Sequence, residues 1–171
     1  MAATSWPNDP RDSSVLSRLV GCWAGTVQHR ASADQPFVQL PGTSENRWVH
    51  EGRFVEMTLR TGGLGDSWSA VFYIGYERSE RRHVQVSLGP GDRRVTTRRG
   101  GWTLSDSNRL LLLSEQAKTT CDLTTPGELK LELEEQSASG HDFVRFRADY
   151  RPASAAVPPP VSRQTRRFVI A

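Results

Sequence analysis

The sequence predicts an all-β protein whose strands form one closed, antiparallel up-and-down barrel, with a short helix before the first strand. Roughly ten short β-prone segments follow one another at spacings of about 8–12 residues, separated by turns rich in Gly and Arg. Segments with helical periodicity are almost absent from the rest of the chain. Because an open sheet of this size leaves exposed edges, closure into a barrel is the favoured architecture.

A short helix is predicted just before the first strand. Asp12 or Ser13 can cap its start, and Gly21 supplies a stop at its C-terminal end. Its apolar positions recur at helical spacing and are Val15, Leu16, Leu19 and Val20. The sequence leaves room for one or two helical turns here.

Beyond Gly21 the apolar period changes to two, which indicates a strand. One face of that strand carries Trp23, Gly25, Val27 and His29. Residues 43–61 then predict a hairpin with its turn at Glu51-Gly52. That turn pairs Trp48 with Val55, Asn46 with Met57, Arg47 with Glu56 and His50 with Arg53.

The hairpin has one dry face and one charged face. The dry face holds Trp48, Val55, Met57 and Leu59, with His50 at its end. The charged face holds Glu45, Arg47, Glu56, Thr58 and Arg60. We therefore expect the dry face to point into the barrel and the Arg47 and Glu56 pair to form an outward ion pair.

The later strands follow the same period. Residues 68–76 place Trp68, Ala70, Phe72, Ile74 and Tyr76 in phase, and residues 83–88 offer Val84, Val86 and Leu88 as their apolar set. A further strand is expected at residues 117–124. The leucine run at 110–113 is continuous, so periodicity alone does not orient it.

Two strictly alternating strands close the pattern. Their apolar faces carry Leu129, Leu131 and Leu133 on one strand and Val144, Phe146, Ala148 and Tyr150 on the other. Their polar faces place Glu132 and Glu134 beside Arg145 and Arg147. Each exposed ion pair contributes about 0–1 kcal/mol, so the match indicates register more than stability.

The composition allows one domain. A chain of 171 residues with 36% hydrophobic and 24% charged residues is ordinary for a soluble globular protein. We expect a flexible N-terminus over residues 1–11, the barrel over 12–151 and a Pro/Arg-rich tail over 152–171. No signal peptide and no apolar run of membrane length are visible, so we expect a cytoplasmic protein without a membrane partner.

Cysteine usage and charge exclude other classes. Cys22 and Cys121 lack any metal-site or redox spacing, so both are expected to be free thiols. The net charge of +3 and several arginine pairs are compatible with nucleic acid, but 19 acidic residues are interspersed with them. No stacking aromatic motif accompanies the arginines, so the sequence argues against a nucleic-acid partner.

Several segments together resemble known barrel families. The stretch LVGCWAGT resembles the Gly-x-Trp signature that opens lipocalin-like, or calycin, barrels. With GTSENRWVHEGRFVEMTLR, FYIGYERSERRHVQVSL, GGW and the closing DYR, the series resembles the uncharacterised bacterial family DUF1579 and, more remotely, the nitrobindins. The resemblance implies a barrel that binds a small apolar molecule. It implies no settled activity.

The resemblance to nitrobindins raises haem as a cofactor. Those proteins hold haem through a histidine on a late strand. Here His141 comes a few residues too early, and Arg145 stands near the position where the histidine is expected. We therefore expect no cofactor and keep haem binding as the third alternative.

Local motifs for chemistry are missing. The four histidines are too scattered to form a metal motif, and the sequence has no GxSxG, HExxH or GxxxxGK. We predict a non-catalytic site for a small hydrophobic ligand, because an apolar barrel interior with one or two polar groups is typical of such sites. The predicted ligand-binding residues are Trp23, His29, Trp48, His50, Met57, Phe72, Leu131, Phe146 and Tyr150.

Two other functions stay open. The first is a biosynthetic isomerase or cyclase in which His50, His29, Glu56 or Tyr73 supplies acid–base chemistry. The second is an interaction module that uses the arginine-rich surface or the apolar FVIA end of the tail. A homodimer is compatible with each of these hypotheses.

Overall fold

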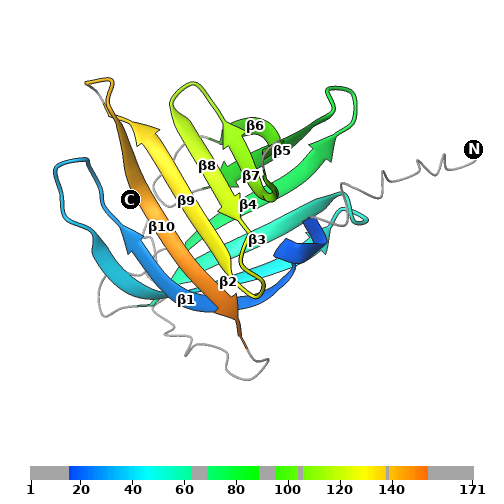
Figure 1. Ribbon diagram of the computed structural model, residues 1–171, viewed down its shortest axis with the longest axis horizontal. Helices are drawn as coiled ribbons and strands as arrows, with labels where there is room; N and C mark the ends of the chain where they lie inside the picture. The colour runs from blue at the N-terminus through cyan, green and yellow to red at the C-terminus, as the bar shows by residue number, and fades with distance from the viewer. Residues whose placement is uncertain (1–15, 63–68, 89–94, 104–105, 138, 154–171) are drawn as a thin grey trace, which may run out of the picture.

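Ten strands and one short 3-10 turn make up the part of the chain that the structure describes. The computed structural model describes residues 16–62, 69–88, 95–103, 106–137 and 139–153 (Figure 1). The predicted flexible N-terminus, the caps at Asp12 or Ser13, Trp68 and the tail beyond Ala153 therefore lie outside the described residues. The elements are η1 Ser17–Leu19, β1 Gly21–His29, β2 Val38–Val49, β3 Phe54–Thr61, β4 Ser69–Glu77, β5 Arg82–Leu88, β6 Thr96–Thr103, β7 Asp106–Leu113, β8 Ala117–Asp122, β9 Leu129–Gln136 and β10 Asp142–Pro152.

The strands form a closed antiparallel barrel. Each strand pairs with the next along the chain, and β1 also pairs with β10, so the sheet closes on itself (Figure 1). The closing register places Trp23 opposite Pro152 and His29 opposite Phe146. The predicted all-β, closed, up-and-down architecture is confirmed.

The predicted N-terminal helix is not confirmed. Within the described residues it is reduced to the single 3-10 turn η1, and Val20 is already extended with φ −69° and ψ 136°. Gly21 does not end a helix; it opens β1 with φ +139°. Of the four apolar positions in this segment, Leu16 and Leu19 are buried, Val20 is half-buried, and Val15 lies outside the described residues.

The turn η1 closes one end of the barrel. The Leu19 carbonyl accepts hydrogen bonds from Trp23 Nε1 at 2.9 Å and from Asn46 Nδ2 at 2.7 Å. Arg18 Nη2 donates to the Leu123 carbonyl at 2.6 Å, just beyond β8. Hydrogen bonds thus connect the turn to β1, to β2 and to the segment just after β8.

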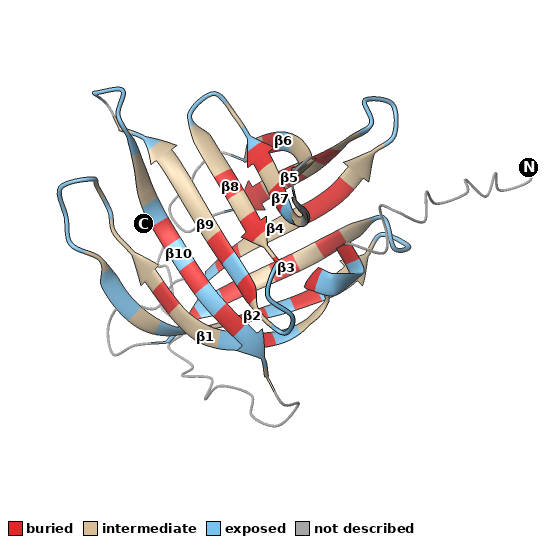
Figure 2. Cartoon of the chain, in the orientation of Figure 1, coloured by how far each residue is buried: buried red, intermediate tan, exposed pale blue. Residues whose placement is uncertain are grey.

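Burial alternates along the strands (Figure 2). In β3 the side chains of Val55, Met57 and Leu59 are at most 1% exposed, whereas their neighbours are less buried. The predicted register of the first hairpin is confirmed, because Arg47 lies opposite Glu56 and the flanking residues pair accordingly. The leucine run is also resolved: Leu110 and Leu112 are buried and Leu113 is exposed.

The predicted face of β5 is wrong. Its buried residues are His83, Gln85 and Ser87, whereas the expected apolar set of Val84, Val86 and Leu88 faces outward, and Leu88 is 45% exposed. The hairpin with β4 imposes this face, because its register sets His83 opposite Tyr76 and Gln85 opposite Ile74. Directly opposed residues share a face, and Ile74 is fully buried.

Val144 is a second correction. A β-bulge between Val144 and Phe146 sets Val144 opposite Glu134, on the outer face, while Phe146 stays opposite Leu133 inside. The bulge also changes the ion pairs: Arg147 reaches Glu132 at 2.7 Å as predicted, but Arg145 reaches Glu135 at 2.6 Å. One extra residue in β10 accounts for both shifts.

The described residues also show the state of the cysteines and the lengths of the helices. Both cysteines are free, with Cys22 exposed and Cys121 buried. Within the described segments, no helix has the length and apolar character needed to cross a membrane.

Candidate functional site

The interior of the barrel, here called the lumen, has an apolar wall and a polar wall. The apolar wall comes mainly from β3, β7, β9 and β10, whose buried residues form the hydrophobic core. The polar wall comes from β5 and β6, with one residue from β8. Its buried side chains are His83, Gln85, Ser87, Arg98 and Thr119.

A small cavity lies between these two walls. Its volume is about 20 Å³, which is room for one water molecule. The residues that line it are Met57, Phe72, Gln85, Thr119, Cys121, Leu131, Glu132, Leu133 and Phe146. The lumen around this cavity is largely filled by side chains.

Two polar atoms of the lining are buried without a hydrogen-bond partner within the described structure. They are Gln85 Oε1 and Thr119 Oγ1, on side chains that are 1% and 7% exposed. A buried polar group left unsatisfied costs about 1–3 kcal/mol. A molecule in this cavity that supplies hydrogen bonds to them recovers that free energy.

Arg98 adds a positive charge to the polar wall. It lies directly opposite Gln85 in the register of β5 and β6, and its side chain is buried, with 5% exposure for the residue. Its Nη1 donates a hydrogen bond to Ser87 Oγ at 3.0 Å. A guanidinium does not lose its proton under physiological conditions, so the charge is permanent.

His83 contributes a neutral ring to the same wall. It lies between two aromatic side chains, with ring centroids 5.1 Å from Tyr76 and 5.8 Å from Trp102. Burial lowers the pKa of His83 to about 4, so the ring is uncharged at neutral pH. His83 Nε2 and Trp102 Nε1 are also buried without a partner within the described segments.

The sequence-predicted lining is divided among several places. Met57, Phe72, Leu131 and Phe146 line the cavity. Trp23 and Tyr150 are buried in the core outside this lining, and Trp48 packs against the core from the side. His29 keeps the inward parity of Trp23 and is half-buried at the end of β1 opposite Phe146.

The expected place of His50 in the lumen is wrong. His50 is exposed and lies in the turn between β2 and β3, where its φ of 50° takes it out of the strand alternation. Its ring lies 6.0 Å from the ring of Phe54 and 6.4 Å from that of Tyr73, measured between centroids. His50 therefore belongs to the outer face of the barrel.

Three of the four acid–base candidates meet on that outer face. Glu56 accepts a hydrogen bond from Arg47 Nε at 2.9 Å and one from the Tyr73 hydroxyl, and His50 lies beside Tyr73. The bonds from Tyr73 and Arg47 lower the pKa of Glu56, and the bond to Glu56 raises the pKa of Tyr73. The fourth candidate, His29, stays on the lumen side of β1.

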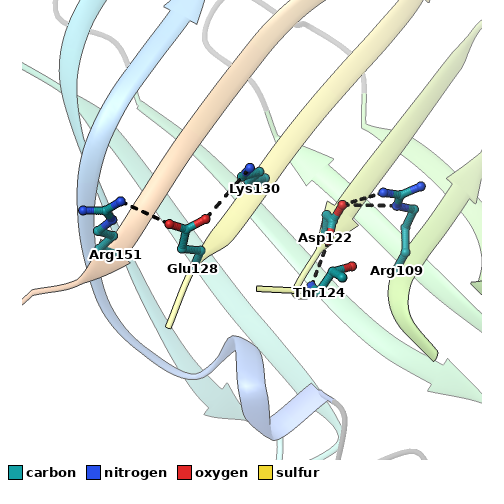
Figure 3. Close-up of polar contacts among 6 residues, drawn as sticks. All are labelled: Arg109, Asp122, Thr124, Glu128, Lys130 and Arg151. Atoms are coloured by element: carbon teal, nitrogen blue, oxygen red, sulfur yellow. Dashed lines mark hydrogen bonds and ion pairs between the residues drawn. The ribbon is translucent and has the colours of Figure 1, made fainter. Parts of the chain in front are cut away.

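A second hollow lies on the outside of the barrel, over β1, β9 and β10. Its volume is about 390 Å³, and its lining includes Ala24, Thr26, Glu128, Lys130 and Arg151. Figure 3 shows Glu128 between Arg151 and Lys130, at 3.1 Å and 3.9 Å. The charges here compensate one another on an open surface, so the lumen is the better candidate site.

Comparison with known families fits the barrel. Residues 10–138 match the family described as "Protein of unknown function (DUF1579)". The chain belongs to this family. No curated protein matches the chain. In the described part of this DUF1579 protein, no group of three His, Cys, Asp or Glu side chains is arranged to hold a metal ion.

The polar wall of this DUF1579 chain was not predicted from its sequence. The buried polar residues alternate along their strands with residues that also fit the inner face; they are Gln85, Ser87, Arg98 and Thr119. On β5, periodicity therefore favoured the apolar residues Val84, Val86 and Leu88 as the inner set. One signal was available: a four-residue turn at 78–81 sets His83 opposite Tyr76, and Tyr76 was already in phase with Phe72 and Ile74. Hairpin register outweighs hydrophobic alternation at this position.

Proposed function

We propose that this DUF1579 protein binds a small molecule with an apolar body and one hydrogen-bonding group inside its barrel. The observation that carries the proposal is the cavity in which Gln85 Oε1 and Thr119 Oγ1 are buried against an apolar wall, with no hydrogen-bond partner among the described residues. Small-molecule sites are typically apolar hollows with a few polar groups that fix orientation. In this proposal Gln85 and Thr119 take the orienting role that was predicted for His50 or His29.

The size of the cavity limits how a ligand enters. A cavity of about 20 Å³ holds one water, so a larger molecule requires side chains to rotate. Met57 lines the cavity and is unbranched, which makes it adaptable. Phe72 is only half-buried, so it has room to move toward the surface of the core.

Catalysis is not part of the proposal. Glu56 and Tyr73 face solvent on the outer wall, where the Glu56 carboxylate is already engaged by Arg47 and Tyr73. A dry, enclosed environment is what acid–base groups need to act on an apolar substrate. Binding without turnover is therefore the function that the arrangement supports best.

The test is titration of the full chain with a neutral amphiphilic probe, 1-octanol, followed by tryptophan fluorescence and by the melting temperature. Bound ligand raises the melting temperature in proportion to the logarithm of its concentration. Thr119→Val keeps the shape of the side chain and removes its hydroxyl, so we expect the Kd for 1-octanol to rise about tenfold. Thr120→Val, on the outer face of the same strand, is the matched control.

Two outcomes contradict the proposal. One is a wild-type chain whose fluorescence and melting temperature do not respond to 1-octanol or to a broader panel of neutral apolar probes. The other is an equal Kd for wild type, Thr119→Val and Thr120→Val, which places the binding site away from Thr119.

A further inference from the structure

The outside of the barrel is apolar over β4 and β5, unlike the outside of the strands that flank them. Ile74 and its partner Gln85 are buried, so the residues that alternate with them point outward. The outward set, here called the outer apolar face, consists of Val71, Tyr73, Val84, Val86 and Leu88, with Val95 just before β6. The outward residues of β3 and β8 include polar or charged Glu56, Thr58, Arg60, Lys118, Thr120 and Asp122.

Exposed apolar side chains gather at this face. In the described part of the chain four large apolar side chains are exposed, and three of them lie on the face or on nearby β7. They are Leu88 at 45%, Val95 at 61% and Leu113 at 49%. Phe54 packs over Gly75 and extends the face toward β3. Single exposed apolar side chains are normal on a protein surface, whereas a contiguous group of them marks an interaction site.

The two sides of β5 have the opposite order from a strand whose outer side meets water. His83, Gln85 and Ser87 are buried, whereas Val84 and Val86 face outward. An antiparallel strand with one solvated side normally carries its apolar residues inside and its polar residues outside. A second protein surface packed against β5 takes the outward valines out of water. The pattern of β5 is therefore that of a strand covered on both sides.

We infer that the outer apolar face is the interface for a second copy of this chain. In the ion pairs around the face that the structure describes, the charges balance. Four arginines meet four carboxylates there, namely Arg47, Arg82, Arg99 and Arg109 with Glu56, Glu77, Glu80 and Asp122. A face with balanced charge does not repel its own copy, and it gives no attraction to a nucleic acid or to an anionic lipid surface.

The region also carries both a projection and an open space. Leu113 projects from β7, and Gly101 on β6 leaves open space beside Leu111, because a Cβ at Gly101 meets nothing within 4 Å. In a two-fold dimer a residue of one copy meets a different residue of the other copy. A projection and a space on one face can therefore complement each other across the axis.

The size of the region sets the strength of the dimer. It spans four neighbouring strands, β4 to β7 (Figure 1). Strands about 4.8 Å apart and about seven residues long make a face of about 19 by 23 Å, so two copies bury about 900 Å² between them. A specific interface needs about 1,000 Å², which places this one at the small end. We therefore expect a reversible dimer. The inference does not depend on the ligand of the lumen.

Analytical ultracentrifugation of the full chain over a series of concentrations at neutral pH tests the inference. We expect wild type to pass from monomer to dimer with a Kd in the micromolar range. Leu88→Arg adds a charge that has to lose its water on association, so the Kd should rise at least about tenfold. Val38→Arg, at a valine of similar exposure (43%) on β2, is the matched control and should keep the wild-type Kd.

Three outcomes overturn the inference. A wild-type chain that stays monomeric overturns it, and the apolar FVIA end of the same chain is then the next occupant of the face to test. An equal Kd for wild type and Leu88→Arg places the dimer contact elsewhere. An equal loss in Leu88→Arg and Val38→Arg shows that added charge, and not this face, weakens association. If Leu88→Arg does not fold, Leu113→Arg at the exposed leucine of β7 takes its place with the same expectation.

Discussion

Gln85 on β5 and Arg98 on β6 lie directly opposite each other in the barrel wall, and both side chains are buried. In this part of the wall the usual order is reversed, because polar residues face inward and Val84 and Val86 face outward. Burial of polar groups costs free energy unless they are hydrogen-bonded. A wall of this kind is expected to stabilise the fold less than an apolar wall would.

The burial of His83 predicts a loss of stability in mild acid. Its pKa is about 4 in the folded protein against 6.5 in the unfolded chain, so between these values the unfolded state binds more protons. The free energy of unfolding therefore falls as the pH drops from 6.5 toward about 4, by up to about 3 kcal/mol. Urea denaturation between about pH 4.5 and pH 7 measures this change.

The matching variants isolate His83 from other titrating groups. His83→Phe keeps a ring between Tyr76 and Trp102, and it should flatten the dependence over this pH range. His141→Gln, at an exposed histidine, is the control and should keep the wild-type slope. A slope that is the same in His83→Phe and wild type contradicts the assignment.

Substitution by Ala is expected to lower stability much more at Gly100 than at its neighbour Gly101. A Cβ on Gly100 would stand 1.9 Å from the backbone oxygen of Leu111 on the paired strand, whereas a Cβ on Gly101 meets nothing within 4 Å. Gly100→Ala should therefore cost at least about 2 kcal/mol, because two backbones have to separate. Gly101→Ala should change stability by less than about 0.5 kcal/mol. Equal melting temperatures for the two variants would contradict this close approach of β6 and β7.

The reaction rate of the Cys121 thiol should measure how accessible the lumen is to solvent. This side chain lines the cavity and is buried, and burial raises its pKa to about 12, so little thiolate exists at neutral pH. In a Cys22→Ser variant, Ellman's reagent should react only slowly with Cys121. Urea should raise this rate, because it unfolds the barrel. Bound 1-octanol should lower the rate below that of the ligand-free protein. In a Cys121→Ser variant the exposed Cys22 should react at once. Equal rates for the two thiols would show an open lumen.

The carboxylate of Asp122 predicts a second loss of stability, at lower pH than the one predicted for His83. Partial burial acts to raise its pKa, but hydrogen bonds from Thr124 and Arg109 outweigh this and lower the pKa to about 2 (Figure 3). The stabilisation is complete above the ordinary value of 3.8 and is lost as the pH falls toward about 2. Because Arg109 is about half exposed and solvent screens the pair, we expect Asp122→Asn to cost about 1 kcal/mol at pH 7. Asp142→Asn, at an exposed residue, is the control for urea denaturation, and an equal loss in both variants would contradict the role of Asp122.

The register of the first hairpin was predictable, and the face of β5 was not. The turn at Glu51-Gly52 has φ of 59° and 78°, which Gly favours, and both strands alternate consistently around it, so local rules agree. In β5 the apolar alternation of Val84 and Val86 disagrees with the register that β4 imposes. A pattern confined to one strand carries no information about the partner strand, and the partner decides.

The candidate site was predictable only on its apolar wall. Phe146 and Leu131 follow from alternation because their strands are amphipathic. Arg98 and Thr119 did not, since an arginine or a threonine on a strand is far more often exposed than buried. The bulge at residues 144–146 is likewise a single inserted residue that leaves no mark in composition.

The pairing of the first strand with the last sets the order of events during synthesis. β1 stays without one of its two neighbours until β10 has left the ribosome, and at about 5–20 residues per second that wait lasts several seconds. During this interval the nascent sheet has two unprotected edges that are open to misassociation. Completion of the barrel therefore waits for β10, and shortening the chain within β10 should leave both edges exposed and increase its binding to chaperones.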